Sequence, residues 1–329
     1  MPSIHRPSRP GRPRRLRRAA GRDGPPRILV LGDLVLDVVI APAAPLETGT
    51  DVPGRVAFVQ GGSAANTARW LGRLGAKATL ISAVGRDATG RALVVAVRAD
   101  RVTVRASRVT GARTARIGVI VSPDGERSFV PDRGAADLLE PDDLKADWFT
   151  GARALHLPIY SLLGVPLGAA GRRAIELARG VGAIVSVDLS SIGPLMAGGR
   201  RAARELVAST AADILFATGS EAETLLGGGP LEGLLDLAEI AVVKRGSKGA
   251  TVLARSGGEH LRFEIATMAL HAADTTGAGD AFDAGFLVGW FAARDAGRSL
   301  PSSLHRGALA GHRTAARQVS TPRPDLPLG

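Results

Sequence analysis

Short apolar runs, separated by residues that favour turns, dominate the chain from residue 27 onward. Residues 28–31 are apolar and are followed by Gly32 and Asp33, the pattern of a buried strand that ends in a turn. Small and apolar residues recur at helical spacing over residues 63–74 and stop at Gly75, which predicts a helix. The other strands predicted in this part of the chain are residues 38–40, 55–59, 78–84, 117–121 and 127–130.

Strand-like and helical patterns alternate from residue 150 onward. This alternation predicts a doubly wound, mostly parallel α/β sheet flanked by helices. The early strands, with a hairpin turn at residues 122–125, fit that sheet less well and predict a small separate sheet. The predicted later strands are residues 154–157, 183–187, 214–216 and 240–243, with helices such as 169–178 and 221–226 between them.

Residues 1–26 differ from the rest because they consist largely of Arg, Pro and Gly and offer almost nothing to a core. We expect a disordered tail there. The formal net charge is +11 at pH 7, but residues 1–27 alone hold nine arginines and one acid. The body is therefore nearly balanced in charge, and nucleic-acid binding is expected of the tail at most. No apolar segment follows the paired arginines at 14–15 and 17–18, so we expect a cytoplasmic protein rather than an exported one.

Length and composition place the remaining residues in one large globular domain. The chain has 329 residues, of which 45% are hydrophobic, enough for a full-sized core. The absence of cysteine excludes thiol nucleophiles, zinc–thiolate sites and disulfides. No uncharged apolar run reaches about 18 residues, so no membrane span is expected.

The segment from Asp274 to Asp280 reads DTTGAGD and precedes an apolar stretch that predicts a buried helix. Gly277, Ala278 and Gly279 are small, so the free N–H groups at the start of this helix can approach a ligand closely. These groups and the helix dipole stabilise negative charge, such as that on a transferring phosphoryl group. Asp280 lies where the dipole favours the ionised carboxylate, which can take a proton from an attacking hydroxyl. On its own, the segment is also consistent with a helix cap that has no catalytic role.

A second polar segment, residues 61–66, reads GGSAAN and leads into the helix predicted over residues 63–74. Its glycines let the backbone approach a small ligand, and Asn66 can both donate and accept hydrogen bonds. Asp37 lies shortly after the first strand, and ligands of open α/β sheets bind at the carboxyl ends of strands. Asp37, Gly62 and Asn66 are therefore candidates for binding a polar small molecule, although each alone could serve a structural turn.

Residues 61–90 resemble the first signature of the ribokinase-like, phosphofructokinase B (PfkB) family of carbohydrate kinases, and residues 274–287 resemble the second. The order and separation of the two segments also match, and the resemblance covers residues 27–319. It implies a ribokinase-like kinase domain over residues 27–320, followed by a C-terminal tail over residues 321–329. Segments at about residues 36–60 and 115–131 would form a lid over the substrate and pair two subunits into a homodimer.

The resemblance implies an ATP-dependent enzyme that phosphorylates a primary hydroxyl of a small sugar or sugar-like substrate. Asp280 would be the general base, in front of an anion hole made by residues 277–279. Magnesium would assist, since no G-x-x-x-x-G-K-[ST] segment is present to hold the phosphates. The other implied roles are Asp37, Gly62 and Asn66 for the sugar, Lys244, Gly246 and Gly249 for the nucleotide, Glu221 for Mg²⁺ through water, and Asp274 with the backbone around Thr276 for a monovalent cation such as K⁺.

Several positions depart from the family pattern. Thr218 stands where the family usually has Asn, so hydrogen bonding to Mg·ATP is expected to be weaker. Tyr160 stands where ribokinases have Glu, and Ala136 replaces a common Asn, so free ribose is not the expected substrate. Tyr160 could stack on a sugar or a base, or it could be a core residue. Arg133 is expected to be a solvated loop residue, which leaves no basic group for a phosphosugar.

Three alternatives follow from these departures and from the α/β pattern. A nucleoside kinase of the same family fits the same residues. A relative that binds nucleotide or sugar without turnover is suggested by Thr218. A dinucleotide-dependent oxidoreductase would share the fold pattern, but Gly32-Asp33-Leu34 does not supply the G-x-G-x-x-G turn after the first strand.

Overall fold

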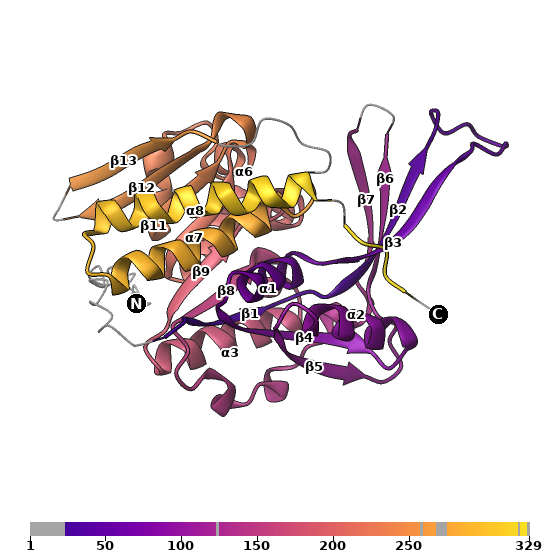
Figure 1. The fold of residues 1–329 in the computed structure, drawn as a ribbon, viewed down its shortest axis with the longest axis horizontal. Coiled ribbons are helices and arrows are strands. Elements are labelled where there is room, and N and C mark those ends of the chain that lie inside the picture. Colours follow the sequence, from indigo (N-terminus) through magenta and orange to yellow (C-terminus); the bar gives the residue numbers. More distant parts are fainter. Residues whose placement is uncertain (1–23, 123–124, 257–258, 268–274, 322, 328–329) are drawn as a thin grey trace, which may run out of the picture.

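The computed structural model describes residues 24–122, 125–256, 259–267, 275–321 and 323–327. The predicted tail over residues 1–26 lies almost wholly outside these ranges, and so does Asp274. The described residues form a nine-stranded sheet with helices on both faces and a separate four-stranded sheet (Figure 1). The α/β fold with a small second sheet is therefore confirmed. Among the described residues, no helix combines the length and apolar character that a membrane crossing requires.

The main sheet has the strand order β13-β12-β11-β10-β9-β8-β1-β4-β5 and is parallel except at β12 and β13. Its strands are buried on both faces: in β1, Ile28 and Val30 enter one core and Leu29 and Leu31 the other. β1 pairs with both β4 and β8, so the strand order reverses there, and this reversal marks the place where ligands bind such sheets. The strands are β1 (Arg27–Leu31), β4 (Lys77–Gly85), β5 (Thr103–Val109), β8 (Ala154–Pro158), β9 (Ile184–Asp188), β10 (Ala212–Thr218), β11 (Ala238–Lys244), β12 (Ala250–Ser256) and β13 (Glu259–Ile265).

Helices cover both faces of the main sheet. α1, α2, α7 and α8 pack on one face, and α3, α5 and α6 pack on the other. The α-helices are α1 (Ser63–Arg73), α2 (Ala88–Arg98), α3 (Leu167–Gly180), α4 (Ile192–Leu195), α5 (Gly199–Ser209), α6 (Gly219–Leu226), α7 (Ala278–Asp295) and α8 (Leu300–Ser320). Short 3₁₀ turns lie at Gly134–Asp137, Pro141–Asp143, Ala146–Phe149, Ile159–Leu162, Met196–Gly198, Leu231–Asp236 and Gly246–Lys248.

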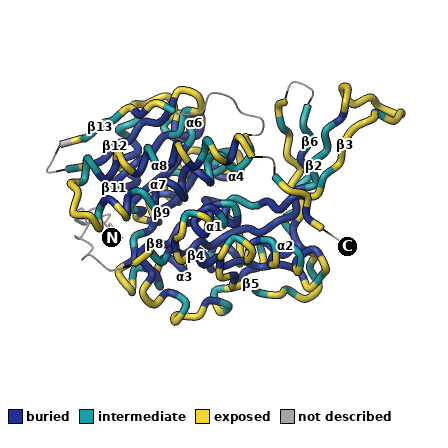
Figure 2. Tube along the Cα trace, viewed as in Figure 1, coloured by how far each residue is buried: buried dark blue, intermediate teal, exposed yellow. Residues whose placement is uncertain are grey.

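The small sheet projects from the body and has the strand order β3-β2-β6-β7 (Figure 1). It comprises β2 (Val35–Pro42), β3 (Gly54–Gly61), β6 (Arg116–Val121) and β7 (Arg127–Asp132). The far part of β3 and most of β7 are exposed, whereas the base of β3 is buried (Figure 2). The sheet coincides with the segments that the sequence assigned to a lid.

The described part of the predicted C-terminal tail is not free. The backbone N–H of Leu326 donates to the carbonyl of Phe58 on β3 at 2.6 Å, and the Leu326 side chain is buried. The chain beyond α8 therefore lies against the small sheet.

Candidate active site

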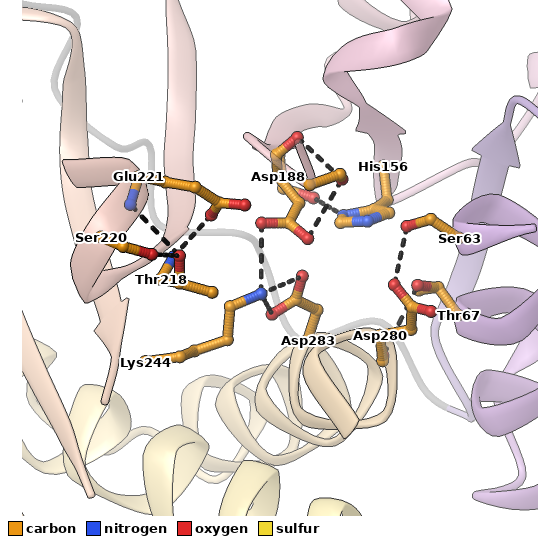
Figure 3. Close-up of polar contacts among 12 residues, drawn as sticks. Ser63, Thr67, His156, Asp188, Thr218, Ser220, Glu221, Lys244, Asp280 and Asp283 are labelled. Atoms are coloured by element: carbon orange, nitrogen blue, oxygen red, sulfur yellow. Dashed lines mark hydrogen bonds and ion pairs between the residues drawn. The ribbon is translucent and has the colours of Figure 1, made fainter. Parts of the chain in front are cut away.

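The first turns of α1 and α7 meet at the carboxyl group of Asp280. Ser63 donates to Oδ1 of Asp280 at 2.7 Å (Figure 3). Asn66 donates to Oδ2 of Asp280 at 2.9 Å. Each helix begins at a glycine with positive φ, +100° at Gly62 and +75° at Gly277. These conformations suit glycine, which has no Cβ to clash with the backbone. The structure thus brings the start of α1, with Gly62 and Asn66, next to residues 277–280 at the start of α7.

Burial raises the pKa of Asp280 to about 7, and the charge of Asp188 adds to this effect. The hydrogen bonds from Ser63 and Asn66 act in the opposite direction because they favour the ionised form. The sequence predicted an ionised carboxylate from the helix dipole, whereas a pKa of about 7 leaves the carboxyl group only partly ionised at neutral pH. A carboxyl group with this pKa can both accept and release a proton near neutral pH.

Asp33 organises the entry to α1. Its Oδ1 accepts from the N–H of Ala64 at 3.2 Å, so it caps a helix whose N-cap glycine has no side chain. Its Oδ2 accepts from Arg133 at 3.2 Å, and Arg133 also pairs with Asp137. The expectation that Arg133 is a solvated loop residue is wrong: its side chain is only 20% exposed and lies over the ring of Tyr160 at 5.0 Å. One face of Tyr160 is therefore covered by a guanidinium group.

Asp37 forms a second pair of this kind. Arg323, from the segment after α8, donates to Oδ2 of Asp37 at 2.8 Å, and both side chains are largely buried. A Cβ at Gly61 would collide with the Asp37 carboxylate, so glycine is required at this position for Asp37 to lie where it does. The sequence analysis named Asp37 as a candidate for binding the substrate, but it did not predict that Arg323 pairs with Asp37.

Lys244 joins the end of β11 to α7. Its Nζ lies 3.1 Å from Oδ1 of Asp188 and 3.1 Å from Oδ1 of Asp283. Asp283 and Asp280 are three residues apart on one face of α7: Asp283 points to Lys244, and Asp280 points to Ser63 (Figure 3). A Cβ on Gly279 would lie 3.3 Å from Nζ of Lys244, which places this ammonium group beside the predicted anion hole.

The cluster around Lys244 contains more acid than base. Burial would lower the pKa of Lys244, but Asp188 and Asp283 outweigh it and hold the pKa above its ordinary value. Burial raises the pKa of Glu221, and Asp188 raises it further. Three carboxyl groups (Asp188, Glu221 and Asp283) therefore share one ammonium group, which suits a further cation with a preference for oxygen ligands.

Thr218 and Glu221 form a reciprocal cap at the start of α6. Thr218 Oγ1 accepts from the N–H of Glu221 at 3.3 Å, and Glu221 Oε2 accepts from the N–H of Thr218 at 2.7 Å. Thr218 is thus a helix cap, a role that the Asn of the family pattern could also fill. Gly246 and Gly249 lie in the turn between β11 and β12, both with positive φ.

Several residues of the site were not singled out from the sequence: Asp33, Asp188, Asp283, Arg323 and Gln318. Asp188 ends a strand that was predicted, and the carboxyl ends of parallel strands line the ligand crevice. That rule could have identified Asp188. No sequence pattern identifies Arg323 or Gln318, because their partners lie more than 40 residues away along the chain.

Comparisons with known proteins show which family the chain resembles. The model of the pfkB family carbohydrate kinases matches residues 25–326. A curated relative, "Fructokinase-1" of Zea mays, is 31% identical over 277 residues, covering 80% of this chain and 82% of the relative. The crystal structure of adenosine kinase from Sinorhizobium meliloti superposes with a TM-score of 0.79 at 26% identity, covering 92% of this chain and 96% of the other. That of a probable sugar kinase from Rhizobium etli gives 0.76 at 27% identity, covering 91% and 94%. The two signatures, the site and the match over the whole body lead to one conclusion: the chain belongs to the pfkB family of carbohydrate kinases.

Proposed function

We propose that the protein transfers the γ-phosphoryl group of ATP to a primary hydroxyl of a small neutral sugar, with Asp280 as general base. The observation that carries this proposal is the position of Asp280, held by Ser63 and Asn66 in the first turn of α7. Asp280 takes the proton of the hydroxyl as its oxygen forms the new bond to phosphorus. The bond from phosphorus to the bridging oxygen breaks, and ADP leaves.

The backbone at Gly277, Ala278 and Gly279 supplies the anion hole in this proposal. The N–H of Ala278 donates to the carbonyl of Thr275 at 3.1 Å, so Gly277 and Gly279 are the better placed donors of the three. The start of α7 also carries the positive end of the helix dipole and lies beside the ammonium group of Lys244. These groups stabilise the negative charge that develops on the transferring phosphoryl group.

The residues around Lys244 fit a magnesium ion held jointly with the nucleotide. No group of three or more His, Asp or Glu side chains within the described ranges could hold a metal by itself. Mg²⁺ typically uses one or two carboxylates together with substrate phosphates, and Glu221 and Asp188 supply such carboxylates. The ion would neutralise phosphate charge, while Lys244, Gly246 and Gly249 line the nucleotide side.

The pairing of the arginines favours a neutral substrate. Arg133 is balanced by Asp33 and Asp137, and Arg323 is balanced by Asp37, so neither guanidinium is left to pair with a substrate phosphate. Asp37 and Asn66 can bind sugar hydroxyls. Fructose is the first candidate, since a fructokinase relative is 31% identical to this chain.

A nucleoside is the second candidate, since adenosine kinase from Sinorhizobium meliloti shares the fold at 26% identity. Against it, Arg133 covers one face of Tyr160, so a base could stack only on the other face. The contact between Arg133 and Tyr160 therefore makes stacking of a nucleoside base on Tyr160 less favourable.

The small sheet is proposed to act as a lid and to pair two copies of the chain. It exposes four large apolar side chains, Val56, Phe58, Phe129 and Val130. Val56, Phe58 and Val130 share one face of this sheet, whereas Phe129 lies on the other. A homodimer through the first face would bury those three side chains, and light scattering should then give twice the mass of one chain. Val130→Ser should shift the protein toward the monomer.

The test of the function is ADP release from Mg·ATP across fructose, other sugars, sugar acids and nucleosides. Substrate-dependent turnover in the wild type that is lost in Asp280→Asn would support the proposal. Glu205→Gln is the control, because it removes an exposed carboxylate on α5 that touches no part of the site. Full turnover in Asp280→Asn would refute the assigned base. Binding of ATP without turnover on any substrate would favour a non-catalytic relative.

A further inference from the structure

Gln318, near the end of α8, connects α1 to the turn that precedes α7. The indole N–H of Trp70 donates to Oε1 of Gln318 at 2.8 Å. Nε2 of Gln318 donates to the carbonyl oxygen of Thr276 at 3.0 Å. Trp70 and Gln318 are both buried, so the hydrogen bond between them is buried, whereas the bond from Gln318 to Thr276 is partly buried.

The orientation of the Gln318 amide is fixed by its partner. An indole N–H can only donate, so the oxygen of the amide must face Trp70. Nε2 then faces Thr276, whose carbonyl can only accept. A flipped amide would place N–H against N–H at one end and oxygen against oxygen at the other.

Fixing the carbonyl of Thr276 also fixes the next N–H group. The peptide unit between Thr276 and Gly277 is planar, and in the trans form its C=O and N–H point in opposite directions. Because the C=O points toward Gln318 on α8, the N–H of Gly277 points away from α8. Gly277 is the residue at which α7 begins, so its N–H belongs to the proposed anion hole.

We propose that Gln318, locked by Trp70, is the positioning residue of the anion hole, and that it makes a monovalent cation at Thr276 unnecessary. This inference rests on the proposed kinase function. A cation bound to the Thr276 carbonyl would meet the positive N–H end of the Gln318 amide, which already occupies that side of the oxygen at 3.0 Å. Gln318 thereby takes one of the two lone pairs of the Thr276 carbonyl and opposes a cation on the same side of the oxygen.

Gln318→Met is the first variant, because Met fills a similar volume but makes neither hydrogen bond. We expect kcat to fall about tenfold to a hundredfold, less than the roughly hundredfold to thousandfold loss when a donor itself is removed, and KM for the sugar to change less than about threefold. The matched control is Arg317→Met, which changes the neighbouring exposed residue of α8 and should leave kcat unchanged. A kcat of Gln318→Met equal to that of the wild type would overturn the proposal.

Trp70→Phe is the second variant and serves if Gln318→Met fails to fold. It keeps an aromatic ring but frees the amide to flip, so kcat should fall by a smaller factor. The double variant should lose no more than Gln318→Met alone, because both changes act through one hydrogen-bond chain. If the factors by which kcat falls in the two single variants multiply in the double variant, Trp70 does not act through Gln318. That result would overturn the proposed chain of hydrogen bonds.

A third experiment tests whether turnover depends on a monovalent cation. It compares the turnover of the wild type in potassium chloride with that in tetramethylammonium chloride at equal ionic strength. We expect the two rates to agree within about twofold. A wild-type rate that depends strongly on potassium would overturn the claim that Gln318 replaces the cation.

Hydrogen exchange gives a readout that does not require turnover. Amides of the peptide around residues 275–281 should exchange about fivefold faster in Gln318→Met than in Arg317→Met, because the turn is no longer anchored. Unchanged exchange would overturn the positioning role. If the wild type phosphorylates no substrate but exchange still responds, the function is wrong and the anchoring is right.

Discussion

Nδ2 of Asn66 and Oδ2 of Asp280 lie 2.9 Å apart, although 214 residues separate them in sequence. Asn66 is the fourth residue of α1, and Asp280 is in the first turn of α7. The hydrogen bond therefore joins the residue proposed to bind the sugar to the proposed general base. It also sets the orientation of the carboxylate before any substrate is bound.

The pH dependence of activity should follow the pKa of Asp280, which burial raises to about 7. A general base must be deprotonated, so kcat/KM should rise with pH and level off above about pH 7. Ser63→Ala removes a hydrogen bond that lowers this pKa. The acidic limb of the pH–rate profile should therefore move to higher pH in the variant. An unchanged limb would show that another group controls it.

Asp280→Asn should stabilise the fold more at alkaline than at acidic pH. The folded pKa of about 7 lies above the ordinary value of 3.8, so the folded state binds the proton more tightly than the unfolded state. Stability from this group is present below about pH 4 and is lost as pH rises through about 7. Thermal unfolding should give a Tm difference between variant and wild type that is larger at about pH 8 than at about pH 5. A constant difference would mean that burial does not penalise the charged carboxylate.

Lys244→Met should destabilise the protein by about 3–5 kcal/mol, because it leaves Asp188 and Asp283 buried without their cation. Urea unfolding measures the loss. Lys248→Met is the control, since Lys248 lies exposed in the turn that follows Lys244. The double variant Lys244→Met/Asp283→Leu should recover part of the lost free energy of unfolding. A double variant less stable than Lys244→Met alone would contradict the pairing of Lys244 with Asp283.

Arg323→Met should raise KM for the sugar about tenfold, or about 1.4 kcal/mol, and leave KM for ATP nearly unchanged. The reason is that Asp37 loses the partner that orients its carboxylate. Arg55→Met tests the same C-terminal segment, because Arg55 pairs with Asp325 at 3.7 Å on the exposed surface. Such exposed pairs contribute about 0–1 kcal/mol, so this control should behave as the wild type. Equal effects of the two variants would contradict a specific role for Arg323.

Thr218→Asn should preserve stability and strengthen nucleotide binding. Asn caps helices as well as Thr does, so the free energy of unfolding should change by only a few tenths of a kcal/mol, whereas Thr218→Ala should cost about 1 kcal/mol. The added amide supplies hydrogen bonds that Thr lacks, so Kd for Mg·ATP, measured by calorimetry, should fall. Weaker binding in Thr218→Asn would show that the hydroxyl itself serves the nucleotide.

The sequence allowed the alternating part of the fold to be predicted, because strands buried on both faces read as continuous apolar runs. β1, β4 and α1 were predicted within one or two residues of their observed bounds. β5 was not predicted: it lies at the edge of the sheet, and Arg105 and Ser107 interrupt its apolar pattern. The periodicity of an edge strand is weaker because part of its surface faces solvent.

The sequence pointed to those parts of the candidate site whose residues are neighbours along the chain. It did not point to the pairs whose members are far apart along the chain. The glycines and Asp280 stand together in sequence, so local chemistry was enough to identify them. The pairs Asp37–Arg323 and Asp33–Arg133 depend on segments that only the tertiary structure brings together. The same reason explains why Arg133 was expected to be solvated, since a loop arginine shows its partners only after folding.

Every described strand ends by Ile265, whereas α7, α8 and Arg323 come later in the chain. During synthesis on the ribosome, both sheets therefore emerge before α7 and α8, two of the four helices that cover one face of the main sheet. A nascent chain, or a product truncated before residue 278, would expose an apolar surface and would be prone to aggregate. It would also lack Asp280, so a prematurely terminated message should yield insoluble protein rather than a weakened enzyme.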